Sequence, residues 1–288
     1  MKMILKLAAA LPLALGLSMA HASEAGYPLD HFPVEKLTNQ AALQTGAKLF
    51  VNYCLNCHGA SSMRYNRLTD LGLSEAQIKT NLMFTADKVG ELMKVAIAPV
   101  DAKKWFGALP PDLSVIARAR ASGAGSGSDW LYTYLRTFYR DATRPTGWNN
   151  AVFANVGMPH VFWELQGGRG ATIEETRAVK DPKTGEPTGF EKTLITFDAT
   201  GQRTESRSEL EGLHHHEGHS ITLAKAEGGL LSPAAYDETV ADLVAYITYM
   251  SDPSALARTR LGVWVLLFLG LFTVFAWWMN REYWKDVK

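Results

Sequence analysis

The sequence predicts a mainly α protein with loop and β-hairpin insertions and a single C-terminal transmembrane helix. Two segments, Gln40–Tyr53 and Tyr236–Met250, place apolar residues on one face at helical spacing. A third, Leu261–Met279, contains no charged residue and is long enough to cross a bilayer. Lys192–Phe197 alternates as a strand does. The chain of 288 residues is long enough for one large domain.

The first 22 residues have the features of a cleaved signal peptide. Lys2 and Lys6 precede the apolar run Leu7–Leu17, and Ala20-His21-Ala22 provides a small-residue cleavage site. The alternative is an uncleaved signal anchor, but the apolar run is shorter than a membrane span. We therefore expect the mature chain to start at Ser23, outside the cytoplasm.

The first predicted helix, Gln40–Tyr53, leads directly into the segment Cys54–His58. Its apolar face comprises Ala42, Gly46, Leu49, Phe50 and Tyr53. Short helices are expected within Leu68–Gly90. Two prolines then form a turn at 108–114, and we expect Asp112 or Ser114 to cap the helix that follows it.

The centre of the chain alternates between flexible and helical patterns. Ser122–Ser128 has the composition of a Gly/Ser linker, and Trp130–Tyr139 has the pattern of a helix. Thr146–His160 is expected to be a loop, in which the residue before Pro159 is biased towards extended backbone. The polar, acidic stretch Gln166–Gly229 contains the predicted strand and a turn at 199–202 that could fold it back as a hairpin.

The C-terminal part divides into a helix and a membrane anchor. Pro253 closes the amphipathic helix that ends at Met250. Tryptophan and tyrosine residues flank the apolar span, as in the aromatic belts of membrane proteins. We therefore expect one domain at 23–257, with an acidic insertion at 166–229, and an anchor with a short cytoplasmic tail at 258–288.

The distribution of charge argues against a nucleic-acid-binding protein. Residues 23–257 hold 27 acidic against 22 basic residues, so the domain is net negative although the whole chain is neutral. This balance favours a cationic partner.

The two cysteines of the chain both lie in Cys54-Leu-Asn-Cys-His58, so no disulfide framework is present. This Cys-x-x-Cys-His pattern is typical of covalent attachment of one haem c, with the histidine below the iron. A thioredoxin-like dithiol would need an α/β context. A zinc site would need two more ligands, and the nearest cluster, His214–His216 with His219, is more than 150 residues away. An exported domain favours the haem.

The second axial position of the iron decides between electron transfer and oxygen chemistry. A methionine thioether would close the site and raise the reduction potential. Of the candidates Met63, Met83, Met93, Met158 and Met250, Met158 alone lies in an extended loop that can pass over a flat ring, and the alternative for it is an exposed loop residue. Arg118 and Arg120 follow the proline turn and are candidates to neutralise the haem propionates, or else they belong to a solvated helix face.

These motifs together resemble the cytochrome c1 family, the haem subunits of the cytochrome bc1 complex. The resemblance runs from about Gly26 to the C-terminus, excluding Gln166–Gly229. The matching segments are Cys54-Leu-Asn-Cys-His58, Met63-Arg-Tyr-Asn-Arg67, Leu109-Pro-Pro-Asp-Leu-Ser114 with Arg118-Ala-Arg120, Asn155-Val-Gly-Met-Pro159 and Ser251-Asp-Pro253 before the anchor. The haem motif is shared by all c-type cytochromes, whereas the proline turn, the late Gly-Met-Pro and the anchor in this order are more specific.

The resemblance implies a class I cytochrome c fold, with His58 and Met158 as axial ligands and Arg120 near a haem propionate. It also implies a respiratory electron carrier of ubiquinol–cytochrome c oxidoreductase in the bacterial inner membrane, with the haem domain on the periplasmic side. Its partners would be cytochrome b, the Rieske iron–sulfur protein as electron donor, and soluble cytochrome c as acceptor. The chain itself would have no catalytic residue and no quinol site.

Two features depart from the family pattern. The insertion is long, and residues 164–217 hold eleven acids against seven bases. We hypothesise that it steers a basic cytochrome c, and a solvated excursion without a partner is the equal alternative. The His214–His219 cluster is either a zinc site or, as its composition favours, a surface loop.

Two other functions remain to be weighed. One is a free membrane-tethered cytochrome that shuttles electrons to a terminal oxidase, which would need a long flexible linker before the anchor. The other is a haem enzyme with an open iron site, which would lack a distal ligand. The few residues between Met250 and Arg258 favour a fixed position in a complex.

Overall fold

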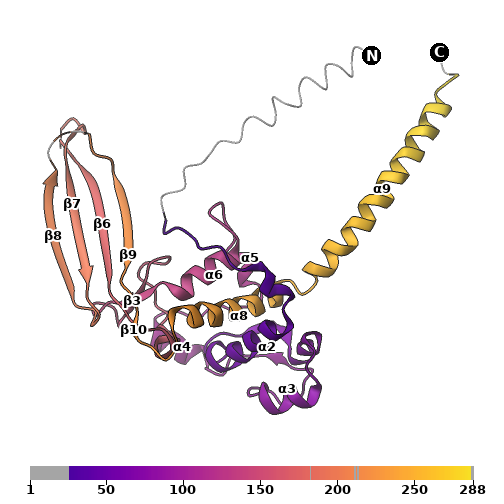
Figure 1. The fold of residues 1–288 in the computed structure, drawn as a ribbon, viewed down its shortest axis with the longest axis horizontal. Coiled ribbons are helices and arrows are strands. Elements are labelled where there is room, and N and C mark those ends of the chain that lie inside the picture. Colours follow the sequence, from indigo (N-terminus) through magenta and orange to yellow (C-terminus); the bar gives the residue numbers. More distant parts are fainter. Residues whose placement is uncertain (1–25, 182, 211, 213, 287–288) are drawn as a thin grey trace.

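The fold is taken from a computed structural model that describes residues 26–181, 183–210, 212 and 214–286. It consists of a helical domain, a β-sheet that projects from it, and one long C-terminal helix (Figure 1). The expected signal peptide and the cleavage site before Ser23 lie outside the described residues, as does Lys288 at the end of the tail.

Two crossing helices, α2 (Gln40–Leu49) and α8 (Pro233–Ser251), form the centre of the helical domain. They approach so closely that a Cβ atom on Gly46 would lie 2.0 Å from the carbonyl oxygen of Asp242 in α8. The apolar face of α8 is buried at Val240, Leu243 and Val244. Both helices were predicted from sequence, and their apolar faces meet in one core that includes residues from Phe32 to Met250.

Side-chain caps fix where the main helices begin. Asn39 accepts a hydrogen bond from the backbone N–H of Ala42 and so caps α2. Ser74 and Gln77 form a capping box at α3 (Glu75–Asn81). The side chain of Ser232 caps α8, whose first residue is a proline.

The expected cap after the proline turn is wrong. Helix α5 (Ile116–Ala119) starts after Val115 and has no side-chain cap. Asp112 instead accepts hydrogen bonds from the backbone N–H groups of Ser61 at 2.8 Å and Ser114 at 2.9 Å. The carboxylate therefore ties the turn to a segment about 50 residues earlier instead of opening a helix.

The expected linker at 122–128 is also wrong, because this stretch is a tight turn followed by the start of α6 (Gly127–Arg136). Ser126 and Asp129 form a capping box there. Gly127 is needed because a Cβ atom would lie 1.8 Å from the carbonyl oxygen of Ala117. Helix α6 ends at Arg136, earlier than predicted, and a short strand follows.

The remaining elements of the helical domain are short. They are η1 (Val34–Thr38), η2 (Phe50–Cys54), β1 (Ala60–Arg64), η3 (Tyr65–Leu71), β2 (Leu92–Met93), α4 (Pro99–Phe106), β3 (Phe138–Arg140), β4 (Trp148–Asn150) and α7 (Trp163–Gln166). Strand β1 pairs with β2, and β3 pairs with β4, both antiparallel. The short helices expected within 68–90 correspond to η3 and α3.

The insertion is a four-stranded antiparallel sheet, which is more than the predicted hairpin. Its strands are β6 (Ala171–Lys180), β7 (Pro187–Phe197), β8 (Arg203–Leu210) and β9 (Gly218–Leu223), in the order β8-β7-β6-β9. The predicted hairpin, with its turn at 199–202, is β7–β8. At the base of the sheet, β5 (Gly167–Gly168) pairs with β10 (Glu227–Gly228).

The sheet contacts the helical domain through a small apolar cluster at its base. Tyr139 packs there against Phe197 and Ala171. Further out, the charges pair within the sheet, as in Glu174 with Lys192 at 3.0 Å. The net acidity of the insertion is thus partly neutralised locally, and a role in steering stays a hypothesis.

The histidine cluster lies at the start of β9. His219 is in the strand, and His214–His216 precede it, with the ring of His215 5.9 Å from that of Phe190. Within the part of the chain that the structure describes, no group of three potential ligands could hold a metal ion. The structure therefore gives no support to the zinc alternative.

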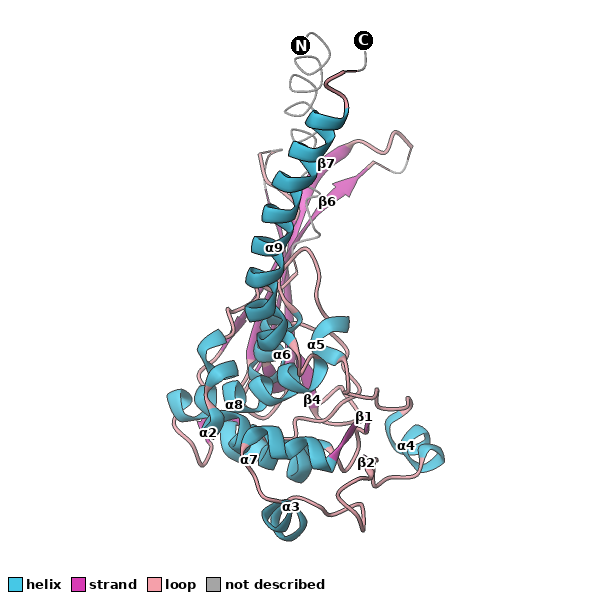
Figure 2. Ribbon diagram, turned by 90° about the vertical axis from the view of Figure 1, so that its right-hand side faces the viewer, coloured by secondary structure: helices cyan, strands magenta, loops and turns pink. Residues whose placement is uncertain are grey.

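The expected anchor is one uninterrupted helix, α9 (Ala255–Tyr283), which projects from the helical domain (Figure 2). Its apolar side chains are exposed. Its mean hydropathy reaches 2.1, and it is the one described helix long and apolar enough to span a membrane. Only Asp252, Pro253 and Ser254 separate it from α8. The guanidinium of Arg258 binds both carboxylate oxygens of Asp252, at 3.1 and 2.7 Å, across this joint.

The α2–α8 crossing makes a prediction about stability. Replacing Gly46 with alanine should destabilise the domain by about 2 kcal/mol, because the clash with a backbone carbonyl outweighs the higher helix propensity of alanine. The midpoint of thermal unfolding, followed by circular dichroism of the detergent-solubilised protein, should fall by about 4–8 °C. Gly123→Ala is the control, because nothing lies within 4 Å of its Cβ position. Equal midpoints for the two variants would contradict the close crossing.

Candidate haem site

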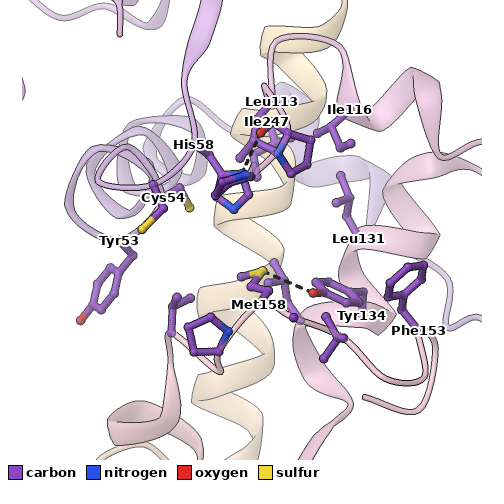
Figure 3. Close-up of a pocket in the computed structure, with 18 of the residues that line it drawn as sticks. Tyr53, Cys54, His58, Leu113, Ile116, Leu131, Tyr134, Phe153, Met158 and Ile247 are labelled. Carbon is purple, nitrogen blue, oxygen red and sulfur yellow. Dashed lines mark hydrogen bonds between the residues drawn. The ribbon is translucent and has the colours of Figure 1, made fainter. Parts of the chain in front are cut away.

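A cavity of about 330 Å³ lies at the side of α8, between two walls that come from distant parts of the chain (Figure 3). One wall is the Cys54–His58 segment with the proline turn. The other is the loop that ends at Met158, together with α6. Apolar side chains such as Leu113, Ile116 and Leu131 fill most of the remaining lining.

The cysteine segment follows directly from the end of α2. The helix widens into the π-helical turn η2, and the backbone N–H of His58 then bonds to the carbonyl oxygen of Cys54 at 2.8 Å. Both cysteines are unpaired and line the cavity. Burial raises the pKa of Cys54 to about 12 and also raises that of Cys57, so both remain thiols at neutral pH. Such thiols are weak nucleophiles at neutral pH, which disfavours a redox dithiol.

The ring of His58 is oriented by a backbone carbonyl. Its Nδ1 lies 2.7 Å from the carbonyl oxygen of Pro111. Because a carbonyl can only accept, Nδ1 carries the proton and Nε2 keeps its lone pair. Burial lowers the pKa of His58, which keeps the ring neutral. Figure 3 shows the free edge of the ring pointing into the cavity.

The turn that supplies this carbonyl is itself held in place. The backbone N–H of Leu113 bonds to the carbonyl oxygen of Gly59 at 2.8 Å, and the Asp112 carboxylate bonds to Ser61. The turn is therefore anchored to the segment that immediately follows His58. The sequence singled out Asp112 only as a possible cap, because a contact over 51 positions leaves no periodic signal.

Met158 lies on the opposite wall, and its side chain points towards His58 (Figure 3). The hydroxyl of Tyr134 donates a hydrogen bond to its sulfur, with 3.3 Å between Oη and Sδ. Met63, Met93 and Met250 are instead buried in the core, and Met83 packs against it. Among the described methionines, Met158 is the one that lines the cavity, as the loop argument predicted.

The loop that carries Met158 has little regular structure but is held by asparagine side chains. The Asn149 side chain accepts from the N–H of Asn155, which has a positive φ of 60°. The Asn150 side chain accepts from Val152 and Phe153. Sequence reasoning did not identify these residues, although asparagine is the residue type that most readily forms such local turns.

Arg120 lines the cavity, and Arg118 does not. The guanidinium of Arg120 lies over the ring of Trp130, 4.4 Å from its centroid, and 5.7 Å from that of Phe153. Arg118 is exposed outside the cavity. Position after the proline turn left both arginines as candidates, the resemblance implied Arg120, and it is Arg120 that lines the cavity.

His160 is a buried residue that the sequence analysis did not consider. It is 2% exposed, stacks on Phe138 with 4.8 Å between centroids, and meets Trp148 edge-on. Burial lowers its pKa to about 3, so the ring is neutral and packs as an aromatic core residue next to the Met158 loop.

The residues around the cavity fit a covalently bound haem c. Two free thiols and a neutral imidazole lie on one wall, a thioether on the other, and one cation at the edge. A lining this apolar would exclude water from the ring faces. The set predicted from sequence, Cys54, Cys57, His58, Met158 and Arg120, therefore comes together in one place.

Comparisons with known proteins agree with this assembly of residues. The model of the Cytochrome C1 family matches residues 32–167. The cytochrome c1 of Allochromatium vinosum is 42% identical, over 87% of this chain and 86% of that protein. A protein named ammonia monooxygenase gamma subunit, from Nitrosomonas europaea, is 39% identical over 93% of both chains. A cytochrome b/c1 of Bradyrhizobium diazoefficiens is 23% identical, over 86% of this chain and 34% of its own length.

The Asp112 contacts predict that Asp112→Asn destabilises the site. An asparagine can accept only through one atom, so one backbone N–H loses its partner, at a cost of about 1 kcal/mol because the group is largely exposed. Burial acts to raise the pKa of Asp112, but the hydrogen bonds from Ser114 and Ser61 outweigh it and lower the pKa below 3.8. The unmodified protein should therefore have a higher free energy of unfolding than Asp112→Asn above pH 3.8. This difference should vanish as the pH falls through the lower pKa of Asp112 in the folded protein.

Denaturant unfolding of the two proteins across this pH range measures the effect. Asp87→Asn is the control, because Asp87 is exposed and its carboxylate makes no hydrogen bond among those that the described residues form. A difference that stayed constant below pH 3.8 would contradict the role of the ionised carboxylate.

Proposed function

Because the chain belongs to the cytochrome c1 family, we propose that it is the mono-haem electron-transfer subunit of a ubiquinol–cytochrome c oxidoreductase in a cell membrane. Family membership implies one covalently bound haem c. The single observation that carries the proposal is the cavity that places His58 and Met158 on opposite walls beside two free cysteines.

Each side chain has a distinct role in this proposal. Cys54 and Cys57 would hold the haem covalently as thioethers, and His58 would bind the iron through Nε2, which its hydrogen bond leaves free. Met158 would hold the iron through its sulfur from the opposite wall. Arg120 would neutralise a propionate at the cavity edge while its guanidinium remains stacked on Trp130.

With His58 and Met158 both available to hold the iron, the site would change only its oxidation state. A bound haem supplies a reversible one-electron couple, and a thioether ligand favours its reduced form. The apolar side chains that line the cavity would keep water from a bound haem, and no side chain would be needed as an acid, base or nucleophile. This arrangement supports an electron carrier and disfavours a haem enzyme with an open site. It therefore also disfavours the monooxygenase chemistry that the name of one relative suggests.

The electron would arrive from a Rieske iron–sulfur protein and leave to a soluble cytochrome c. The excess of acidic residues in 23–257 suits a basic acceptor. The relative named cytochrome b/c1 joins both names in one protein, which supports cytochrome b as a neighbour of this chain. The chain would act as a subunit of the oxidoreductase without a substrate site of its own.

The joint between α8 and α9 suits a subunit with a fixed position. Only three residues connect the two helices, and the Arg258–Asp252 ion pair spans them. A shuttle that swings on its anchor would need more free chain. The geometry therefore does not favour the membrane-tethered shuttle to a terminal oxidase.

The haem domain would lie on the periplasmic side of a bacterial inner membrane. The signal-like N-terminus supports this orientation, with residues 23–257 outside and the end of 258–288 as a cytoplasmic tail. Arg281, Lys285 and Lys288 after the span against Arg258 and Arg260 before it agree weakly with the positive-inside rule.

The ligand assignment predicts the effect of Met158→Leu. The substitution removes the sulfur but keeps the side chain apolar, so the sulfur-to-iron charge-transfer band should disappear and the midpoint potential should fall. Visible spectroscopy and redox titration of the purified protein measure both. Met83→Leu, outside the cavity, is the control and should retain the band. An unchanged spectrum in Met158→Leu would show that another residue is the ligand.

The proposed assembly predicts co-purification. Affinity isolation of this chain in mild detergent should recover a b-type cytochrome and an iron–sulfur protein in equal amounts, measured by visible and electron paramagnetic resonance spectra. Recovery of a lone haem protein, under conditions in which an unrelated membrane complex stays intact, would contradict the proposal.

A further inference from the structure

A tyrosine that no sequence motif indicated makes direct contact with the proposed sulfur ligand. Tyr134 lies in α6, is 7% exposed, and its hydroxyl donates to Met158 Sδ at 3.3 Å (Figure 3). Among the hydrogen bonds of the described residues, this is the one that the hydroxyl makes. A buried hydroxyl requires a partner, so the thioether is the group that satisfies it.

The ring of Tyr134 is held in place from two sides. It stacks on Trp130 at 4.8 Å with an interplanar angle of 12°, and meets Phe138 edge-on at 5.2 Å. Trp130 is in turn covered by the guanidinium of Arg120. The position of the hydroxyl oxygen is therefore set by the packing of the ring, independently of the sulfur that it contacts.

The Tyr134 hydroxyl is the donor in this contact, because a thioether sulfur can only accept a hydrogen bond. Tyr134 therefore presents the positive end of its O–H dipole to the sulfur.

We propose that Tyr134 is a positioning residue that raises the reduction potential of the haem by hydrogen bonding to the Met158 thioether, an inference that rests on Met158 being the axial ligand. A thioether has two lone pairs, so it can bind iron with one and accept the hydroxyl proton with the other. The hydrogen bond withdraws electron density from the sulfur, and the dipole places positive charge near the iron. Both effects disfavour Fe(III) relative to Fe(II).

The direct test is the midpoint potential of Tyr134→Phe in the intact chain. Phenylalanine keeps the ring stacked on Trp130 and removes only the donor. The Fe(III)/Fe(II) ratio at a fixed potential should rise about fivefold, the factor expected for one lost hydrogen bond. For a one-electron couple this is a midpoint lower by about 40 mV. The charge-transfer band should remain but change wavelength, because the ligand stays sulfur.

Tyr132→Phe is the matched control. Tyr132 lies in the same helix and is partly buried, but its ring packs on Phe32 and Arg136, away from the cavity. Its potential and spectrum should equal those of the unmodified protein. A purely structural role of Tyr134 would leave the potential unchanged, and that result would overturn the proposal.

A second variant of Tyr134 predicts a change in the opposite direction. Site-specific 3-fluorotyrosine at 134 keeps the size of the ring and makes the phenol a stronger donor, so the midpoint should rise. If Tyr134→Phe fails to attach haem, the fluorotyrosine variant still tests the effect of the hydrogen bond on the midpoint potential. A fall or no change with fluorotyrosine would overturn the proposal.

The Met158→Leu measurement distinguishes failure of the proposed ligand role of Met158 from failure of the proposed hydrogen-bond effect of Tyr134. If Met158→Leu keeps its charge-transfer band, the ligand assignment itself is wrong and the role of Tyr134 falls with it. If the band is lost but Tyr134→Phe has the unmodified potential, Met158 remains the ligand and only the hydrogen-bond effect is wrong.

Discussion

The hydrogen bond from His58 Nδ1–H to the carbonyl oxygen of Pro111 is the constraint on which the site depends. It selects one tautomer and one ring orientation, and it leaves Nε2 as the only free lone pair of the ring. The carbonyl can hold the ring only because the Asp112 carboxylate and the Leu113 N–H bind the turn to the chain just beyond His58. The wall formed by Cys54–His58 and the proline turn is thus held together by hydrogen bonds between two segments far apart in sequence.

The opposite wall, which carries Met158, is held mainly by side-chain hydrogen bonds and aromatic packing. Met158 lies on an irregular loop, so its position cannot come from helical or strand hydrogen bonds. Asparagine side chains hold the loop backbone from within, and Tyr134 holds the sulfur from α6. The Tyr134 ring is braced by Trp130, and Trp130 is covered by Arg120. The same stack therefore connects the candidate propionate residue with the candidate axial ligand.

The projecting sheet and the anchor join this core in contrasting ways. The sheet contacts the domain through a small cluster around Tyr139 and pairs charges such as Glu174 and Lys192 internally, and no described residue of its four strands lines the cavity. Helix α9 follows α8 after three residues, and α8 lies at the centre of the core. The orientation of the cavity relative to α9 is consequently set by a short, ion-paired joint.

The sequence by itself determined whatever depends on neighbours in the chain. The attachment segment Cys54–His58, the faces of α2 and α8 and the apolar span all follow from spacing within a few residues. Tertiary contacts decided the rest. Asp112 binds the backbone of Ser61 instead of capping a helix. The segment 122–128, predicted as a linker, contains the start of α6, and the predicted hairpin is part of a four-stranded sheet. Arg120 and Tyr134 line the cavity whereas Arg118 lies outside it, because each position depends on side chains from other segments, about which local pattern carries no information.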